Sequence, residues 1–287
     1  MPPRDVRRAV LAFGAQGLRS LPWRSTRDPW AVLVSELMLQ QTQAARVVPA
    51  WERFLGRFPT VRACAAAGPG EVVAAWSGLG YNRRAIFLHR AAVMVVERHG
   101  GELPDRLSDL LALPGLGPYT ARAVLAFAFE QDVGVLDVNT ARVLARGIAG
   151  HSLSPTEAQD VADALVPRGR GWTWNQALLD LGARVCTSRA PRCGSCPLAG
   201  GCRWRRTGGP DPAPGSAGAG GRQSRFEGSH RQGRGRLLRA LTRGPVKTGA
   251  LASACGWPGD PDRARRAAAG LVQDGLARWD GEALVLA

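Results

Sequence analysis

Four cysteines between positions 186 and 202 constrain what this chain can fold into more than any other feature. They follow the pattern C-x6-C-x2-C-x5-C and are Cys186, Cys193, Cys196 and Cys202. Four thiolates in one short loop are typical of a metal or iron–sulfur centre in a reducing cytoplasm, rather than of a disulfide framework. The spacing leaves zinc and a cubane cluster open, because only one tight C-x2-C pair is present. Cys64 lies apart in a predicted Ala-rich helix and is expected to be a buried small hydrophobic residue.

The charge of the chain predicts a polyanionic partner. Its 287 residues carry 38 basic and 23 acidic side chains, a formal net charge of +15. Nucleic acid is the simplest such partner. Lys247 is the single lysine, so a Schiff base can hardly form on a lysine of this chain. No apolar run approaches the roughly 18 residues that a membrane helix needs, and no membrane partner is expected.

The composition divides the chain into three parts. Residues 208–224 hold six glycines and three prolines, which is typical of a flexible linker. The predicted domains are therefore residues 1–207, including the cysteine loop, and residues 225–287. Residues 203–287 carry a net charge of +8, about half of the total excess.

Helical periodicity dominates the first part. Asp28 is predicted to cap a helix that starts at Pro29, and apolar residues recur at helical spacing from Trp30 to position 48. Sustained period-two alternation is absent, so an all-α domain is predicted. Further helices are expected over residues 71–76, 83–98, 107–111, 120–129, 139–148, 155–165 and 174–185.

The last part has a different pattern. Short helices are predicted over residues 234–241, 249–254 and 261–273, and Asp280-Gly281 is a hairpin signal between two apolar segments. Three helices and a terminal hairpin form a winged-helix-like, α+β pattern. Such modules often bind DNA, although a protein-contact or packing module fits the same pattern.

A glycine-rich turn is the first candidate binding site. Gly115 and Gly117, in the segment LPGLGPYT, are expected to adopt positive φ and to let a ligand approach the backbone. Pro118 is well placed to begin the next helix, whose free N–H groups would suit a phosphate. A merely tight connection between two helices is the alternative.

Two carboxylates are candidate catalytic groups. Glu36 lies in an apolar helix beside Val32 and Leu39, where partial desolvation would favour its protonated form. An ion-paired or edge position is the alternative. Asp137 follows an apolar stretch and precedes Asn139, so that it either serves chemistry or simply caps the next helix.

Together these segments resemble the helix-hairpin-helix DNA glycosylases of the HhH-GPD superfamily, and within it the MutY-type adenine glycosylases. The broad match lies in SELMLQQTQ, LPGLGPYT, LDVN and the cysteine loop, in this order. The finer match lies in LPWR, MLQQTQ and GLGY, at residues 21–24, 38–43 and 78–81. The resemblance covers about residues 10–204. It implies a two-lobed fold and a [4Fe–4S] cluster.

The resemblance also implies a function, namely removal of adenine mispaired with 8-oxoguanine or guanine in double-stranded DNA. Such an enzyme would act in base excision repair as a monomer on nucleoid DNA in the cytoplasm. The residues that would intercalate at the mispair are Gln41 and Tyr81, with Thr42 and Leu79 nearby. Those that would line the adenine pocket or lie beside the sugar are Trp23, Arg24, Leu39 and Tyr119.

Hydrolysis of an N-glycosidic bond needs protonation of the leaving base and stabilisation of a sugar cation. On the resemblance, Glu36 is the general acid at adenine N7, Asp137 stabilises the sugar, and Asn139 orients Glu36. Tyr119 stands where the endonuclease III branch has its lysine, which predicts a glycosylase with little or no lyase activity. The alternatives are a thymine or uracil mismatch glycosylase and a non-enzymatic DNA-binding regulator.

The resemblance stops short of the C-terminal region. Well-known MutY-type enzymes continue into a larger Nudix-like domain that reads 8-oxoguanine, whereas only about 63 residues follow the linker here. Recognition of 8-oxoguanine therefore stays open in the sequence, and the basic C-terminal module is expected to add nonspecific phosphate affinity.

Overall fold

The computed structural model describes residues 1–216 and 225–287, which form two compact units. The boundary cuts helix α2 (Pro29–Leu39), whose first residues belong to the first unit and whose remainder belongs to the second. The first unit comprises residues 1–33, 105–111 and 116–221. The second comprises residues 34–104, 112–115 and 222–287.

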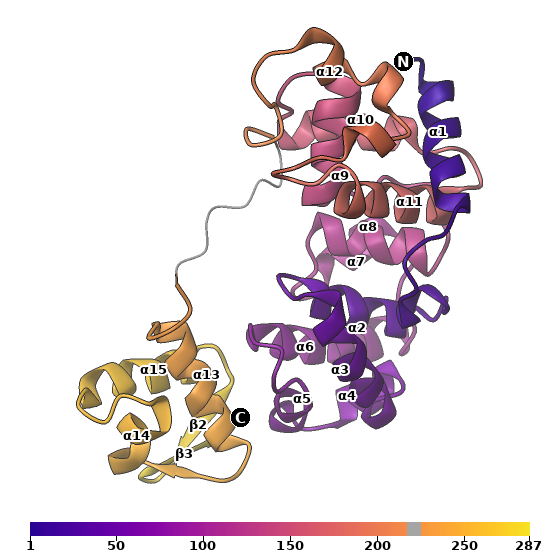
Figure 1. Cartoon of the computed structure of the whole chain (residues 1–287). Coiled ribbons are helices and arrows are strands. Elements are labelled where there is room, and N and C mark those ends of the chain that lie inside the picture. Colours follow the sequence, from indigo (N-terminus) through magenta and orange to yellow (C-terminus); the bar gives the residue numbers. More distant parts are fainter. Residues whose placement is uncertain (217–224) are drawn as a thin grey trace. The chain divides into compact units, whose positions relative to one another are not determined.

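The helices of the first unit pack around an apolar core. Helix α1 packs against α11, and at their crossing a Cβ on Gly14 would lie 2.9 Å from the Ala177 Cβ. The core includes Val10, Leu144 and Trp174, all at most 1% exposed. Its main elements are α1 (Pro3–Ala15), η1 (Pro22–Arg24), α7 (Leu107–Ala112), α8 (Pro118–Phe127), α9 (Val138–Val143), η2 (Leu144–Ala149), α10 (Pro155–Leu165), α11 (Gly171–Arg184), η3 (Cys193–Ser195), η4 (Ala199–Gly201) and α12 (Arg203–Thr207) (Figure 1).

The second unit contains a second set of helices with its own core. Phe54 and Trp76 meet edge to face with ring centroids 5.9 Å apart, and Leu88 is buried as they are. Such aromatic pairs stabilise a core beyond the area they bury. The helices are the remainder of α2, α3 (Ala44–Arg57), α4 (Val61–Ala66), α5 (Pro69–Ala75) and α6 (Arg83–His99).

Residues 225–287 combine three helices with a small antiparallel sheet of strand order β1-β3-β2. Trp279 pairs with Leu284 in the terminal hairpin, as the Asp280-Gly281 signal predicts. The winged-helix-like α+β pattern is thus confirmed, although strand β1 has only two residues and was not predicted. The elements are α13 (His230–Leu241), β1 (Val246–Lys247), η5 (Thr248–Ala250), α14 (Leu251–Cys255), α15 (Pro261–Gln273), β2 (Ala277–Asp280) and β3 (Ala283–Leu286).

The structure confirms several predicted helix starts and helix bounds. Asp28 accepts the Trp30 N–H at 3.0 Å, as an N-cap should, and α8 begins at Pro118. Helix α10 has the predicted bounds. Cys64 is fully buried, and burial raises the pKa of its thiol to about 12, as expected of a small core residue.

One helix prediction is wrong. The apolar periodicity continues from Trp30 to position 48, but α2 ends at Leu39 and α3 begins at Ala44. Gln41 has φ of 55°, in the left-handed region, and this breaks the helical hydrogen-bond ladder. Helices α1 and α12 also lie outside the predicted set, whereas α4 confirms the Ala-rich helix expected around Cys64.

The predicted linker is partly built into the first unit. Asp211 and Ser216 contact this unit through side-chain hydrogen bonds, and Ser216 is buried. Residues 217–224, the rest of the predicted linker, lie outside the described residues. Among the residues that the structure describes, no helix has the length and apolar character needed to span a membrane.

Candidate active site and metal centre

Glu36 occupies the most buried helix of the candidate site. It is 4% exposed, and its neighbours Ser35 and Leu37 are buried as well. Every residue from Ala31 to Met38 is buried, so the Glu36 side chain is shielded from bulk water. The alternative of an exposed edge position is therefore wrong. The role of Glu36 as general acid stays a prediction.

Asp137 is the N-cap of α9, which was one of its two interpretations. Its Oδ1 accepts the N–H groups of Asn139 and Thr140 at 2.9 and 2.7 Å, and its Oδ2 accepts Asn139 Nδ2 at 2.6 Å. These donors hold the half-buried carboxylate in one orientation. The capping interpretation is thus confirmed, and a catalytic role of Asp137 stays a prediction.

The same contacts connect Asp137 to the cysteine loop. Asn139 Oδ1 accepts a hydrogen bond from Arg142 Nη2 at 2.8 Å, and Arg142 Nε donates to the Cys186 carbonyl at 2.6 Å. Burial lowers the pKa of Arg142, while the neighbouring Cys186 and Asp137 raise it. Asp137 and the first cysteine of the loop are thus joined by a chain of three side-chain contacts.

The glycine-rich turn lies between α7 and α8. Gly115 has the predicted positive φ, 81°, and a Cβ there would lie 2.5 Å from the Phe87 Cβ, so no other residue fits. The expectation for Gly117 is wrong, since its φ is −94° and it is the extended N-cap residue of α8. Gly117 and Pro118 are exposed, and Tyr119 follows half-buried in the first turn. Phosphate binding by this turn stays a prediction.

The resemblance places Trp23 and Arg24 at the adenine, and both lie in η1, a 3-10 turn of the first unit. The Arg24 guanidinium is engaged with Asp180 of α11, at 2.8 Å from Nη2 to Oδ1 and 3.1 Å from Nη1 to Oδ2. Arg19 also donates to this carboxylate through Nε and its backbone N–H. Asp180 is fully buried and was not singled out in the sequence.

Two opposing effects set the charge of Asp180. Burial raises its pKa, but the hydrogen bonds from Arg24 and Arg19 outweigh burial and hold the pKa below the usual value. The carboxylate therefore stays ionised and fixes η1, and with it Trp23, against α11. Arg24 thereby supports η1, while its role in lining an adenine pocket stays a prediction.

The residues expected to intercalate lie in two loops of the second unit. Gln41 is exposed and Tyr81 is 37% exposed, whereas Thr42 and Leu39 are half-buried and Leu79 is buried. Arg84 reaches both loops, with Nη2 at 3.2 Å from Thr42 Oγ1 and 3.0 Å from the Gly80 carbonyl. The structure thus brings together two segments that are about 40 positions apart in the sequence.

The four cysteines of the loop converge on one pocket. Cys186, Cys193, Cys196 and Cys202 all line it, together with apolar side chains such as Val143 and Leu198. Burial raises the pKa of the Cys186 thiol, whereas N–H groups of Arg146 and the charge of Arg142 lower it. Four convergent thiols with an apolar surround and cationic neighbours fit a cubane iron–sulfur cluster.

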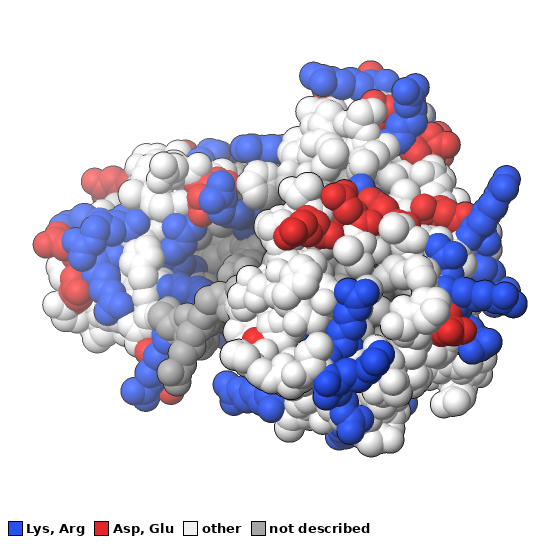
Figure 2. All heavy atoms as spheres, turned by 90° about the horizontal axis from the view of Figure 1, so that it is seen from above, with Lys and Arg blue, Asp and Glu red and all other residues white. Residues whose placement is uncertain are grey.

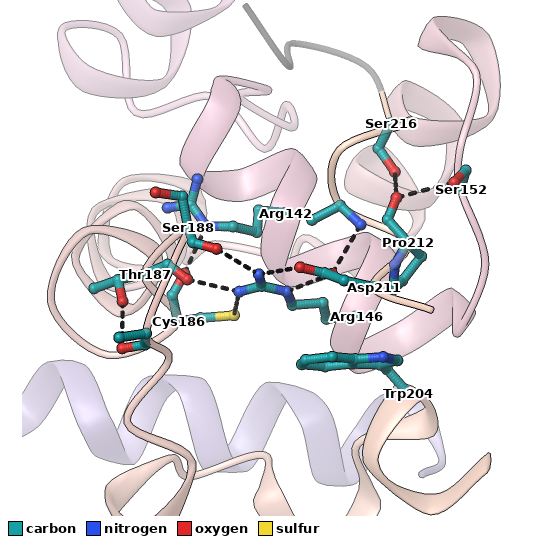
Figure 3. Close-up of polar contacts among 12 residues, drawn as sticks. Arg142, Arg146, Ser152, Cys186, Thr187, Ser188, Trp204, Asp211, Pro212 and Ser216 are labelled. Atoms are coloured by element: carbon teal, nitrogen blue, oxygen red, sulfur yellow. Dashed lines mark hydrogen bonds and ion pairs between the residues drawn. The ribbon is translucent and has the colours of Figure 1, made fainter. Parts of the chain in front are cut away.

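Arg146 supports this centre from η2, a turn of π-helix. It is buried, and Figure 3 shows its guanidinium between the cysteine loop and residue Asp211. Nη1 donates to Cys186 Sγ at 3.6 Å and Nε donates to Asp211 Oδ1 at 2.8 Å. The Trp204 ring lies 5.1 Å from its Cζ. The carbonyls of Thr187 and Ser188 accept its other N–H groups.

Asp211 belongs to the first half of the predicted linker, which folds back on this lobe. Ser216 Oγ and Ser152 Oγ both donate to the Pro212 carbonyl, at 2.7 and 3.0 Å, and Ser216 Oγ accepts the Leu153 N–H (Figure 3). The Arg146 ion pair holds the pKa of Asp211 below its usual value. A strap of residues 211–216 is thereby attached to the metal centre through Arg146.

The charge of the surface is dispersed. On the face drawn in Figure 2, arginine side chains occur in several places and acidic side chains lie among them. Neither sign covers this face alone. On this face the basic side chains therefore do not form one continuous stripe.

Two family models match the chain. Residues 34–167 match the HhH-GPD superfamily base excision DNA repair protein, and residues 186–202 match the iron–sulfur binding domain of endonuclease III. The second range is the cysteine loop itself. This match decides the metal question in favour of a [4Fe–4S] cluster over zinc.

Curated relatives are adenine DNA glycosylases. That of Mycolicibacterium smegmatis is 44% identical over 272 residues, which cover 93% of this chain and 90% of the relative. That of Mycobacterium tuberculosis H37Rv is 43% identical over 275 residues, with 93% and 88% covered. The human protein is 40% identical over 214 residues, but these cover 70% of this chain and 39% of the human protein. The matches to the mycobacterial relatives thus extend into residues 225–287.

Solved structures support the same fold. A thermostable thymine-DNA glycosylase has a TM-score of 0.67 and 28% identity over 71% of this chain and 97% of its own. A non-covalent endonuclease III–DNA complex has a TM-score of 0.62 over 72% of this chain and 98% of its own, at 21% identity, and supports the fold alone. The predicted all-α glycosylase fold with a small C-terminal sheet module is confirmed.

Proposed function

The chain belongs to the adenine DNA glycosylases of the HhH-GPD superfamily, and from this premise we propose that it removes adenine mispaired with 8-oxoguanine or guanine. The observation that carries the proposal is the position of Glu36, a shielded carboxyl at the end of the helix that leads into an exposed loop. The proposed setting is base excision repair by a monomer on nucleoid DNA.

In the proposed reaction Glu36 donates its proton to adenine N7 as the bond between C1′ and N9 breaks. The bonding electrons leave with the base, and the sugar becomes an oxocarbenium ion. The Asp137 carboxylate stabilises this cation, because its position is fixed by three donors of α9. Water then adds to C1′ and gives a proton to the Glu36 carboxylate, which restores the acid. Asn139 is the candidate that orients Glu36, and its amide also holds Asp137.

Access to the glycosidic bond requires that the adenine leaves the base stack. The exposed Gln41 and Tyr81 are proposed to fill the gap, with Thr42 beside them and Leu79 supporting their loop from within the core. Leu39, Trp23, Arg24 and Tyr119 are proposed to form the walls of the adenine and sugar site. Gly115 and Gly117 would let a phosphate approach the start of α8.

The [4Fe–4S] cluster would supply a rigid brace for the cysteine loop. Its four cysteine ligands close residues 186–202 around one pocket, and Arg146 and Arg142 hold the loop from the adjoining helices. Arg189 and Arg192, in the same loop, would then be presented to DNA phosphates. In this arrangement the cluster would serve DNA binding, and Glu36 and Asp137 would carry out the chemistry.

The proposal includes a reaction without strand cleavage. Residues 1–246 contain no lysine, and Tyr119 occupies the position at which the resemblance expects the lyase nucleophile. We expect a substrate duplex with adenine opposite 8-oxoguanine to yield an abasic site, and borohydride to trap no protein–DNA adduct. Efficient trapping would refute this part of the proposal.

A substrate panel tests the proposal as a whole. Single-turnover excision is measured on duplexes with adenine opposite 8-oxoguanine, guanine, cytosine and thymine, and with thymine opposite guanine. We expect adenine release from the first two duplexes. The thymine arm is included because a thymine-DNA glycosylase shares the fold at 28% identity. Preference for thymine would replace the adenine assignment, and no release from any duplex would favour a DNA-binding regulator.

A further inference from the structure

Arg84 is a buried cation at the start of α6, and its contacts lie in the two loops proposed to intercalate. It is 7% exposed. Burial lowers its pKa to about 10, which still leaves the guanidinium charged at neutral pH. A buried charge is retained only where many acceptors surround it, because its desolvation is costly. The identity of those acceptors shows what the residue holds in place.

The first group of acceptors is the C-terminal end of α2. Arg84 Nη1 donates to the carbonyls of Leu37 at 2.6 Å, Met38 at 3.0 Å and Gln40 at 2.5 Å. The last carbonyls of an α-helix lack partners within the helix, so a cation there caps it and favours its dipole. Arg84 thus sets the point at which the helix of Glu36 ends and the loop after it begins.

The second group lies in the two loops. Nη2 donates to Thr42 Oγ1 at 3.2 Å and to the Gly80 carbonyl at 3.0 Å, and Nε donates to the Tyr81 carbonyl at 3.3 Å. Its Cζ also lies 5.4 Å from the centroid of the Tyr81 ring. A cap for α2 alone would need none of these contacts. The same guanidinium therefore connects residues 40–42 to residues 80–81.

Backbone conformation gives an independent sign that these loops are held in place. In residues 1–216 and 225–287, three residues other than glycine have positive φ, namely Gln41, Tyr81 and Glu130. Such conformations cost about 1–3 kcal/mol each and persist where the surroundings determine them. Two of the three are the residues proposed to intercalate, and both adjoin acceptors of Arg84.

We propose that Arg84 is a positioning residue for base flipping, which fixes the Gln41 and Tyr81 loops in the geometry that enters the duplex at the mispair. This inference rests on the proposed function. If Gln41 and Tyr81 are already held in place, the two loops lose less conformational entropy when DNA binds. This stabilises the complex in which the adenine is flipped out. Arg84 itself contacts neither the substrate nor the reacting atoms in this role.

The test compares Arg84→Met and Arg84→Lys with two controls on the same helix. Arg98→Met removes the same charge from an exposed site, and Val95→Ala makes a buried cavity away from both loops. Lysine keeps a charge but offers a single ammonium to acceptors on two loops, so it is expected to behave like methionine.

Three measurements are made on the full chain with its cluster. We expect faster amide hydrogen exchange in residues 40–43 and 78–82 of both Arg84 variants, and wild-type exchange there in both controls. We expect affinity for mispaired DNA to fall at least tenfold, roughly the worth of one hydrogen bond from a charged donor, with matched-duplex affinity within about twofold. Single-turnover excision at saturating enzyme should fall as well.

The outcomes separate the two claims. Wild-type exchange in both loops and wild-type discrimination in Arg84→Met or Arg84→Lys would overturn the inference. Loss of binding to matched and mispaired DNA alike would also overturn it, because it would indicate a general folding defect or a phosphate contact. A wild-type protein that releases no adenine would refute the proposed function instead, and the exchange data would still show whether Arg84 holds the loops.

Discussion

Glu36 and Asp180 both have buried carboxyl groups, but the two groups lie in different surroundings. Glu36 lies on an apolar helix that is closed to solvent, whereas Asp180 accepts hydrogen bonds from two arginines. The first environment suits proton donation, and the second maintains a permanent charge that holds structure.

At Glu36 we expect the substitution Glu36→Gln to abolish excision while binding to mispaired DNA persists. Glutamine keeps the shape but has no proton to donate, and general acid catalysis contributes about 10²–10⁴-fold. Single-turnover excision and mispair affinity are measured together. Glu52→Gln, on the exposed face of α3, is the control. Normal excision by the Glu36 variant would contradict its assignment as the acid.

At Asp180 we expect Asp180→Asn to lower the free energy of unfolding at pH 7 by about 3 kcal/mol, because Arg24 loses its charged partner in a buried site. The folded pKa of Asp180 lies below its usual value of 3.8. Its stabilisation is therefore present above that value and is lost as the pH falls through the lower, folded pKa.

Urea unfolding at several pH values measures this effect. The difference between wild type and variant should shrink on acidification below about pH 4. Asp262→Asn breaks a pair in which both side chains are mostly exposed, and it should change stability by under 1 kcal/mol. An Asp180 variant as stable as wild type at pH 7 would show that the pair contributes nothing to folding.

At the scale of elements, the cluster lobe depends on a π-helical turn. Residues 144–149 form η2, and the Arg146 guanidinium projects from it toward both Cys186 and Asp211 (Figure 3). Turns of π-helix are frequent at functional sites because the extra residue redirects side chains. Here the turn joins the cysteine loop to the strap of residues 211–216.

We expect Arg146→Met to release iron to a chelator roughly tenfold faster than wild type, a loss typical of removing an outer-shell partner of a metal site. The visible absorbance of the cluster follows the loss. Asp211→Asn should have a smaller effect, and should make residues 208–216 more sensitive to a protease. Arg206→Met, at an exposed position of α12, is the control. Equal iron loss in wild type and the Arg146 variant would contradict this support role.

At the scale of the whole molecule, the C-terminal module of residues 225–287 carries positive charge but none of the residues proposed for the chemistry. Residues 225–287 have a net charge of +5 and follow directly on the residues outside the described part. Because the strap of residues 211–216 belongs to the first unit, a truncation should keep it. The informative variant therefore ends at residue 224.

We expect this truncation to weaken binding to undamaged duplex DNA and to flatten its dependence on salt. Each phosphate contact that is lost should lower the slope of log affinity against log salt by about 0.9. Excision at saturating enzyme should stay at the wild-type rate. An unchanged slope would remove the module from DNA binding and favour its role in protein contacts or packing.

The sequence alone was sufficient for the helical class, the cysteine ligands and the order of the C-terminal helices. These depend on local periodicity, capping and the spacing of thiols, which are all written in contiguous residues. Helix α10 and the N-caps Asp28 and Asp137 agree with their signals for this reason. The break after α2 was missed because the apolar period continues through it.

Tertiary structure decided the features that depend on distant partners. No local signal distinguishes Arg84 from the other 36 arginines, or Asp180 from an ordinary surface acid. Arg84 is singled out by carbonyls more than 40 positions away, and Asp180 by arginines of η1 and the segment before it. Capping and periodicity act within a few residues, whereas a buried charge is defined by everything that surrounds it in space.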